Sequence, residues 1–145
     1  MRLSTKGRYA VMAMTDLARR EEQRAVALAD IAARQEISLA YLEQLFSRLR
    51  RKGLVVSARG PGGGYRLARS AAETSIADIV IAVDEPLRAT RCGGDADKGC
   101  MLKGERCLTH DLWEEMGRRI EGYLTSVTLA DVATGRLRRQ EPVAA

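Results

Sequence analysis

All three cysteines and the single histidine of the chain lie within one short segment, residues 91–110. They are Cys92, Cys100, Cys107 and His110, in the spacing C-x7-C-x6-C-x2-H. Thiolate and imidazole are the ligands with which proteins bind zinc, copper and iron–sulfur clusters. Any metal site built from thiolate or imidazole in this sequence must therefore use this segment.

The residues around these ligands are rich in glycine and in basic side chains. Glycines at positions 93, 94, 99 and 104 give the loop the freedom to wrap around an ion or a small cluster, and leave backbone N–H groups free to donate to coordinated sulfur. We expect the flanking cations to favour thiolate over thiol; they are Arg91, Lys98, Lys103 and Arg106. The segment therefore predicts a thiolate metal site.

Three other interpretations stay open at this point. Free cysteines often serve as small buried apolar residues, although a polar, glycine-rich loop is a poor place for burial. Two of the three thiols can instead form a regulatory disulfide. Zinc accepts four-ligand sites of this composition, although its structural sites usually contain C-x2-C pairs, which this segment lacks. Spacing alone does not separate zinc from an iron–sulfur cluster.

The composition indicates one globular domain with an added element for oligomerisation. The chain has 145 residues, of which 46% are hydrophobic but only 4% aromatic, so we expect a mostly aliphatic core formed by helices. It has no apolar run of the roughly 18 residues that a membrane span needs, and its N-terminus lacks a cleavage pattern. We therefore expect a cytoplasmic protein with no membrane partner.

The net charge of +5 is unevenly distributed along the chain. Residues 1–70 carry 14 basic and 6 acidic side chains, whereas residues 71–145 carry 10 basic and 13 acidic ones. This asymmetry suggests that the first half binds a polyanion such as nucleic acid. A solvated basic surface is the alternative explanation.

Three helices are predicted in the basic half, over residues 4–20, 26–36 and 39–52. Ser38 is a plausible N-cap for the third, which ends at Gly53. The buried stripe of this helix contains Leu42, Leu45, Phe46 and Leu49. A different face gathers side chains that can read base edges and hold phosphates, namely Tyr41, Gln44, Arg48 and Arg51.

A basic hairpin is predicted next, from the sequence "LVVSARGPGGGYRL". Two β-prone runs, 54–57 and 65–67, flank a Gly/Pro loop. Three helices followed by such a hairpin make a winged helix-turn-helix, in which the third helix lies in the DNA major groove. Arg59 at the wing tip can enter a minor groove, and Gly60, Pro61 and Gly62 let the backbone approach phosphates.

The second half predicts two more helices. "SIADIVIAV", residues 75–83, has Ser75 as its N-cap and Asp78 in its first turn. After the cysteine segment, a longer helix is predicted from about 109 to 127. Its apolar residues step 3-4-3-4, a seam suited to pairing with another helix, although packing within one subunit is an equal alternative; they are Trp113, Met116, Ile120, Tyr123 and Val127.

The fold class predicted from these elements is mainly α with a small β-hairpin wing (α+β): a winged helix-turn-helix plus a long C-terminal dimerisation helix. We divide the chain into a DNA-binding region (1–70), a region with a linker helix, the cysteine segment (91–110) and the dimerisation helix (71–133), and a disordered tail (134–145).

The sequence resembles a known family in its motifs. "MRLSTKGRYAVMAM", "ISLAYLEQLFSRLRRKGLV", "RGPGGGYRL" and "RCGG…CLTHDLW" together are similar to the iron–sulfur-responsive members of the Rrf2 family of winged-helix transcription factors. The likeness runs from residue 1 to about residue 133. Two departures from the family pattern stand out: the gaps between the cysteines are longer than the five or so residues usual in the relatives, and Ala40 replaces a frequent serine.

The resemblance implies a homodimeric repressor that binds double-stranded DNA and controls iron–sulfur assembly genes, with the assembly scaffold as a possible cluster donor. It implies one 2Fe–2S cluster per subunit, with zinc less favoured, bound by Cys92, Cys100, Cys107 and His110. The residues expected at the DNA interface are Ser38, Ala40, Tyr41, Glu43, Gln44, Arg48, Arg59, Gly60, Pro61 and Gly62.

Two rival functions are weaker. One keeps DNA binding but makes the metal structural zinc, or uses the thiols as a redox switch. The other is an iron–sulfur enzyme or electron carrier. The second is disfavoured because the sequence has no further cofactor motif and no candidate general base other than His110.

Overall fold

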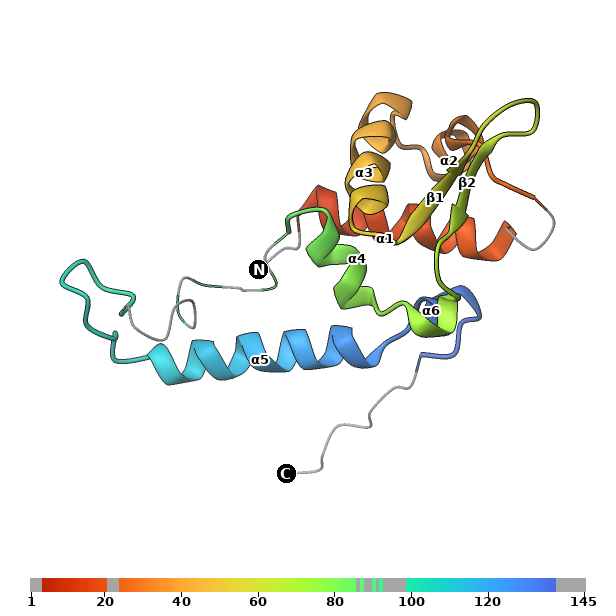
Figure 1. Ribbon diagram of the computed structural model, residues 1–145. Helices are drawn as coiled ribbons and strands as arrows, with labels where there is room; N and C mark the ends of the chain where they lie inside the picture. Colours follow the sequence, from red (N-terminus) through yellow and green to blue (C-terminus); the bar gives the residue numbers. More distant parts are fainter. Residues whose placement is uncertain are drawn as a thin grey trace.

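The computed structural model describes residues 4–20, 24–85, 87, 90, 92 and 99–137 (Figure 1). In chain order its elements are α1 (Thr5–Arg20), α2 (Leu28–Gln35), α3 (Leu39–Arg51), β1 (Val55–Ala58), β2 (Gly64–Leu67), the short 3-10 helix η1 (Ala71–Glu73), α4 (Ile76–Ala82), α5 (His110–Ser126) and α6 (Leu129–Ala133). The predicted fold class is confirmed. Of the helices in the described ranges, none combines the length and the apolar character that a membrane crossing requires.

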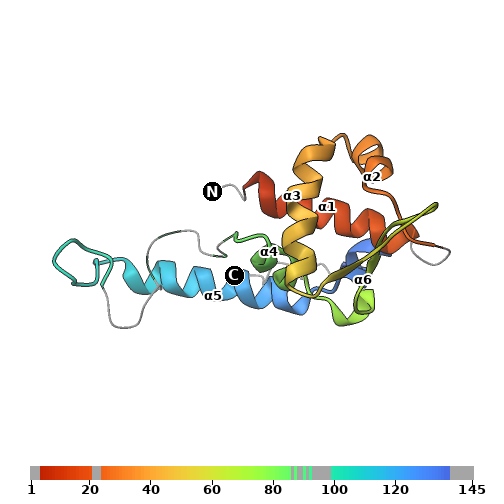
Figure 2. The same cartoon turned by 45° about the horizontal axis from the view of Figure 1, so that its top comes forward.

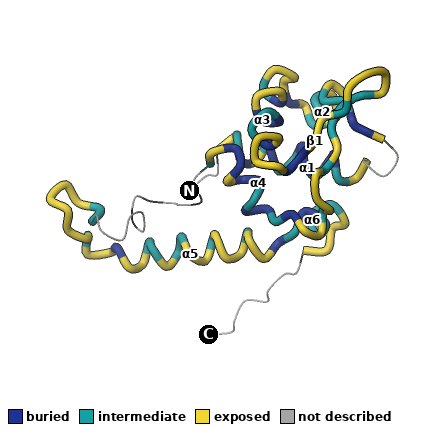
Figure 3. Tube along the Cα trace, viewed as in Figure 1, coloured by how far each residue is buried: buried dark blue, intermediate teal, exposed yellow. Residues whose placement is uncertain are grey.

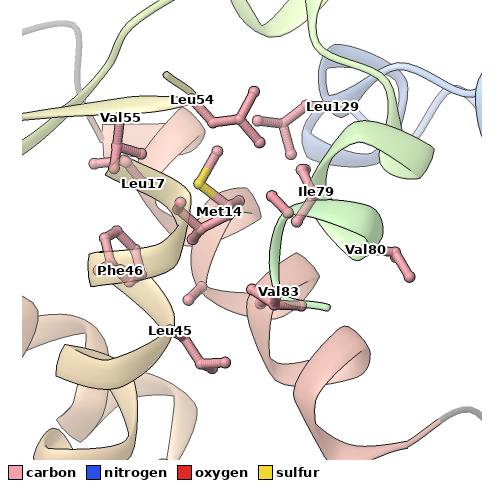
Figure 4. Packing of buried hydrophobic residues seen from close by; sticks show 14 of the residues in the cluster. Met14, Leu17, Leu45, Phe46, Leu54, Val55, Ile79, Val80, Val83 and Leu129 are labelled. Carbon is pink, nitrogen blue, oxygen red and sulfur yellow. The ribbon is translucent and has the colours of Figure 1, made fainter. Parts of the chain in front are cut away.

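Helix α1 is the centre of the body and packs against α2, α3, α4 and α6 (Figures 1 and 2). The side chains of Met14 and Leu17 on α1 are fully buried among residues from α3, β1, α4 and α6 (Figure 4). The stripe predicted on α3 faces this core as expected, with Phe46 fully buried. An aliphatic core thus fixes α3 rigidly against the rest of the body.

Two helix starts follow their sequence signals closely. Ser38 caps α3, because its hydroxyl accepts a hydrogen bond from the Tyr41 backbone N–H at 3.1 Å. Ser75 and Asp78 form a complete capping box at the start of α4. Glu36, at the end of α2, adopts a left-handed conformation with φ of 56°, which makes the tight turn into α3.

The helix α6 was not predicted, and it returns the chain to the body after α5. Thr128 and Asp131 form a capping box for it, and Leu129 is fully buried. The Arg19 side chain on α1 donates to the backbone oxygen of Ala133 at 3.0 Å. The hydrophobic core therefore includes residues on both sides of the boundary between residues 70 and 71. The division of the chain into two functional regions at that boundary stays a prediction. The predicted tail lies outside the described residues from 138 onward.

Helix α5 projects from this body and is mostly exposed along its length (Figure 3). Its C-terminal end is anchored, since the Ile76 N–H donates to the oxygen of Val127 at 2.9 Å and Val127 is buried in the core. Its N-terminal end, at His110, lies far from the body in both views (Figures 1 and 2). The helix therefore holds Cys100, Cys107 and His110 away from the winged helix of the same chain.

An ionic cluster around the buried Asp16 carboxylate joins α1 to α2. The Asp16 carboxylate accepts two hydrogen bonds from the Arg34 guanidinium, at 2.7 and 3.0 Å, and one from the Gln35 amide at 2.8 Å. Burial by itself would raise the pKa of Asp16. The hydrogen bonds from Arg34 and Gln35, with the nearby charges, outweigh it and hold that pKa below its usual value of 3.8.

We expect Asp16→Asn to lower the free energy of unfolding by about 2–3 kcal/mol at pH 7, because it removes the charge of a buried carboxylate and an amide cannot accept all three hydrogen bonds that Arg34 and Gln35 donate there. The ion pair contributes above the unfolded pKa of about 4 and is lost as the pH falls through the lower folded pKa. The difference between the two proteins should therefore shrink below about pH 4. Urea unfolding at several pH values measures it, and Asp84→Asn, at an exposed ion pair, should cost under about 0.5 kcal/mol.

Candidate metal centre and nucleic-acid interface

The structure brings the four predicted ligands together at the free end of α5. The Cys92 Sγ lies 3.7 Å from the Cys107 Sγ, and the Cys100 Sγ lies 3.5 Å from the His110 Nδ1. The ligand atoms of Cys92, Cys100 and His110 all lie within 4.8 Å of one another. All three cysteines are free thiols. Residues separated by up to 18 positions thus converge on one small volume.

The two short separations have the size that metal coordination requires. Two ligands of one tetrahedral ion with metal–sulfur bonds of about 2.3 Å lie about 3.8 Å apart. The Cys92–Cys107 pair and the Cys100–His110 pair both approach this value. The donor set of three thiols and one imidazole therefore fits a thiolate-bound metal centre.

The thiols differ in how readily they ionise. Burial and hydrogen bonds to the neighbouring thiols raise the pKa of Cys92 to about 11. The pKa of Cys107 is lowered to about 7, first by its hydrogen bond with Cys100 and then by Thr109. At neutral pH Cys107 therefore offers a thiolate more readily than Cys92 does.

The expected effect of the flanking cations on the thiols stays a prediction. The Arg106 guanidinium lies 4.0 Å from the Asp111 carboxylate. Arg91 and Lys98 lie outside the described residues, and so do Gly93 and Gly94.

Two glycines are required by the shape of the loop between Cys100 and Cys107. The Gly99 N–H donates to the oxygen of Gly104 at 3.1 Å, and a Cβ on Gly99 would lie 2.2 Å from the Glu105 backbone. Gly104 has φ of +83°, which favours glycine. This closed turn lets the backbone N–H of Cys107 donate to the Cys100 Sγ at 3.1 Å.

Thr109 occupies the N-cap position of α5 but does not cap it. Its side chain makes no hydrogen bond to the first-turn backbone, although capping by threonine is worth about 1 kcal/mol. Its hydroxyl instead accepts from the Trp113 Nε1 at 3.0 Å and lies 3.8 Å from the Cys107 Sγ. His110 is buried in the first turn, with its Nε2 3.9 Å from the Glu114 carboxylate.

The candidate nucleic-acid interface is the outward face of α3 with the hairpin beside it (Figure 2). Four of the predicted residues near the start of α3 are exposed; they are Ser38, Ala40, Glu43 and Gln44. Tyr41 is half-buried and makes an edge-to-face contact with Tyr9, with ring centroids 6.0 Å apart. Glu43, Gln44 and the Tyr41 hydroxyl can offer hydrogen-bonding groups near the start of the helix, whereas Ala40 offers only a methyl group.

Arg48 occupies a different position. Its guanidinium donates to the Val83 oxygen at 3.3 Å and lies 3.7 Å from the Asp84 carboxylate, beyond the end of α4. The side chain therefore bridges α3 and α4 instead of extending freely beside Gln44. Its expected contact with DNA stays a prediction.

The hairpin forms a wing with a tightly specified tip. β1 and β2 are antiparallel, with Ala58 opposite Gly64. Strand β1 ends one residue later than the predicted run 54–57, and β2 begins one residue earlier than the predicted run 65–67. The Gly63 N–H donates to the Gly60 oxygen at 2.8 Å, and Pro61 followed by Gly62 at φ +75° is the sequence of a type II turn. Arg59 and the tip residues 60–62 are exposed, as a DNA-contacting wing requires.

The wing is seated on the body by two contacts that sequence reasoning did not find. Val26 pairs with Tyr65 through two backbone hydrogen bonds of 3.0 and 2.8 Å, which adds a single residue to the sheet. The Tyr65 ring packs edge-on against Phe46 of α3, with centroids 5.0 Å apart. The orientation of the wing is thereby fixed relative to α3.

The pattern of a winged helix with a cysteine segment is matched by one family model, described as "Iron-dependent Transcriptional regulator", over residues 3–135. The chain belongs to the Rrf2 family. It is therefore a transcriptional regulator that binds DNA, and not an enzyme.

Individual Rrf2 proteins agree with this assignment. The chain is 54% identical over 136 residues to "HTH-type transcriptional regulator IscR" of Serratia proteamaculans, which covers 94% of this chain and 81% of that one. Identity to the regulator of the same name from Klebsiella pneumoniae is 52% over the same length, covering 94% and 82%.

Solved structures of Rrf2 regulators share the fold. "T. potens IscR" matches with a TM-score of 0.75 and 36% identity, covering 97% of this chain and 94% of the other. CymR, the global cysteine regulator of B. subtilis, matches with a TM-score of 0.78 and 32% identity, covering 93% and 98%.

Thr109 and Trp113 are the residues at the metal centre that sequence reasoning left without a role there. The sequence predicts Trp113 as part of a helix seam and Thr109 only as the first residue of that helix. One signal was present, since residues four apart lie on the same face of a helix. Only the structure shows that their side chains meet beside Cys107.

Proposed function

We propose that this Rrf2 regulator senses iron–sulfur cluster supply and represses iron–sulfur assembly genes in the cytoplasm. The single observation that carries the proposal is the convergence of three thiols and one imidazole at the end of α5, in a chain whose other part is a winged helix. The name "Iron-dependent Transcriptional regulator" of the family model and the similarity to IscR proteins support it.

The residues proposed to hold a 2Fe–2S cluster are Cys92, Cys100, Cys107 and His110. The presence of the cluster would report iron supply, because the cluster is lost when iron is scarce or oxidants are abundant. Binding by residues as far apart in sequence as Cys92 and His110 would tie them to one group at the N-terminal end of α5, and loss of that group would release them, which is the change that a sensor needs. An assembly scaffold protein is the proposed source of the cluster.

A second copy of this chain is the proposed partner of α5. Tyr123 is 54% exposed, and Trp113, Met116 and Ile120 lie half-buried along the same side of the projecting helix. Val127, the last member of the predicted seam, is excluded because it is buried in the core of its own chain. Light scattering should give twice the chain mass of 15.9 kDa.

In the proposed DNA complex, the start of α3 lies in a major groove and the wing tip contacts the adjacent minor groove. Gln44 is exposed on α3 and can make a bidentate contact with adenine. Two such units in a dimer would read the two halves of a palindrome.

We expect Gln44→Ala and Arg59→Ala each to weaken specific DNA binding by about 1–3 kcal/mol. Gln44→Ala should lower the affinity for the target sequence but not the affinity for a scrambled sequence. Arg59→Ala should also reduce the salt dependence of binding, because a wing arginine that contacts phosphate releases counterions. Fluorescence anisotropy with specific and scrambled duplexes measures both. Arg119→Ala removes the same charge from α5 and should bind as the wild type does; equal affinity in all four proteins would contradict the placement of the interface.

The cluster is tested by purification without oxygen, followed by a visible spectrum and by determination of iron, sulfide and zinc. The proposal predicts a red-brown protein with two irons and two sulfides per chain, whose colour is lost in air. A colourless protein with one zinc per chain would overturn it.

Zinc is the second candidate, and one observation favours it. Three ligand atoms within 4.8 Å of one another, with pairs at 3.5 and 3.7 Å, match the compact shell of a single ion. A two-iron cluster requires a wider set. The thiol-redox alternative is supported by the same 3.7 Å separation of the Cys92 and Cys107 sulfurs. A disulfide between them would remove two free thiols, so counting thiols before and after mild peroxide treatment tests this alternative.

A further inference from the structure

We propose that Trp113 and Thr109 form a hydrogen-bond relay that sets the electron density on the Cys107 sulfur, so that both are positioning residues of the metal centre. This inference rests on the proposed function, because it concerns the sulfur that would bind the metal. Its evidence is the placement of the Trp113 indole N–H and the Thr109 hydroxyl beside the Cys107 sulfur.

The direction of the relay follows from the chemistry of its groups. The indole N–H can only donate, so the Thr109 hydroxyl oxygen accepts from Trp113 at 3.0 Å. The single hydroxyl hydrogen of Thr109 is then left free to point elsewhere. Cys107 Sγ lies 3.8 Å away, and a metal-bound thiolate can only accept, so the hydroxyl donates to the sulfur.

The diversion of Thr109 from capping supports a role at the sulfur. A threonine at the N-cap position normally accepts from the backbone of the first turn, and here it makes no such bond. Local rules fail most often where function imposes another geometry. The same helical turn places Trp113 over Thr109, since residues four apart lie on one face.

Two hydrogen bonds to ligand sulfurs come from groups of different kinds. Cys100 receives one from the backbone N–H of Cys107 at 3.1 Å, which no substitution of a side chain removes. Cys107 receives the other from a side chain, which a single substitution can delete. Hydrogen bonds to coordinated sulfur raise the reduction potential of an iron–sulfur cluster. The relay therefore gives this protein an adjustable control over how easily the centre is oxidised.

The test compares Thr109→Val, Thr109→Ser and Trp113→Phe in the cluster-loaded protein by redox titration. Thr109→Val, which has the same shape but no hydroxyl, should shift the reduction potential to a more negative value. Thr109→Ser keeps the hydroxyl and should match the wild type. Trp113→Phe keeps the ring but not the N–H, and should shift the potential in the same direction by less. In the Thr109→Val background, Trp113→Phe should add no further shift.

Equal potentials in Thr109→Val and Thr109→Ser would overturn the relay, and so would a full additional shift from Trp113→Phe in the absence of the hydroxyl. A loss of cluster yield alone, without a shift in potential, would mean a merely structural role and would also overturn it.

Cobalt(II) separates this inference from the proposed function. The sulfur-to-cobalt absorption band of the protein loaded with Co²⁺ alone should move to longer wavelength in Thr109→Val and stay in place in Thr109→Ser. If the wild type binds no cluster but this band shifts, the relay stands and the proposed cluster fails. If the cluster forms and neither the band nor the potential shifts, the relay fails alone. A wild type that binds neither metal through its thiols overturns both.

Discussion

The Cys100→Ala variant is expected to purify without iron, sulfide or zinc under conditions in which the wild type retains its metal. Binding of a structural metal by four such ligands is worth about 10–16 kcal/mol, so the loss of one ligand should remove about 3 kcal/mol or more, which is over 100-fold in affinity. Cys100 lies next to His110, and its sulfur also accepts the N–H of Cys107. Its removal therefore disturbs two of the other three ligands.

Metal analysis and the visible spectrum measure this loss. The affinity of Cys100→Ala for DNA should equal that of wild-type protein stripped by a chelator, because both lack the bound group. Lys103→Ala, at an exposed position of the same loop, is the matched control and should retain full metal content. Full occupancy in Cys100→Ala would exclude this residue as a ligand.

The Gly64→Ala variant is expected to lose about 2–4 kcal/mol of unfolding free energy and most of its specific DNA affinity. A Cβ at this position would lie 2.1 Å from the backbone oxygen of Val26, so either the wing or the segment before α2 must move. That movement breaks the two hydrogen bonds between Val26 and Tyr65 and disturbs the Tyr65–Phe46 contact. The wing then loses its fixed orientation beside α3.

Urea unfolding and anisotropy with the specific duplex measure the two effects of Gly64→Ala. Gly122→Ala adds the same methyl group to α5, where no atom lies within 4 Å, and should stabilise the protein by about 0.5–1 kcal/mol. A Gly64→Ala protein as stable as the wild type would show that the wing tolerates displacement. It would then be a mobile element rather than a rigid one.

A separate set of backbone contacts joins the two sites of the molecule. The base of α5 is hydrogen-bonded to the start of α4, and the Leu129 N–H at the start of α6 donates to the oxygen of Thr74, the residue after η1, at 2.8 Å. Ser75 and Thr128 pair as a single bridge at this point. The metal centre is therefore carried on a helix whose other end is built into the core that holds α3.

The sequence by itself determined the features that depend on neighbouring residues. Helices α1 to α5, the caps at Ser38 and Ser75 and the turn of the wing were predictable, because each is decided within a few positions of the chain. The set of candidate ligands was predictable for a different reason: the chain contains no other cysteine or histidine.

The tertiary structure alone decided the features that join distant segments. The pairing of Val26 with Tyr65, the burial of Asp16 against Arg34 and the return of α6 to α1 all depend on how the helices pack. Packing also engages Arg48 with the end of α4. Local signals were overridden for the same reason at Thr109, whose hydroxyl is committed to Trp113 and Cys107 because the fold of the loop brings a sulfur within its reach.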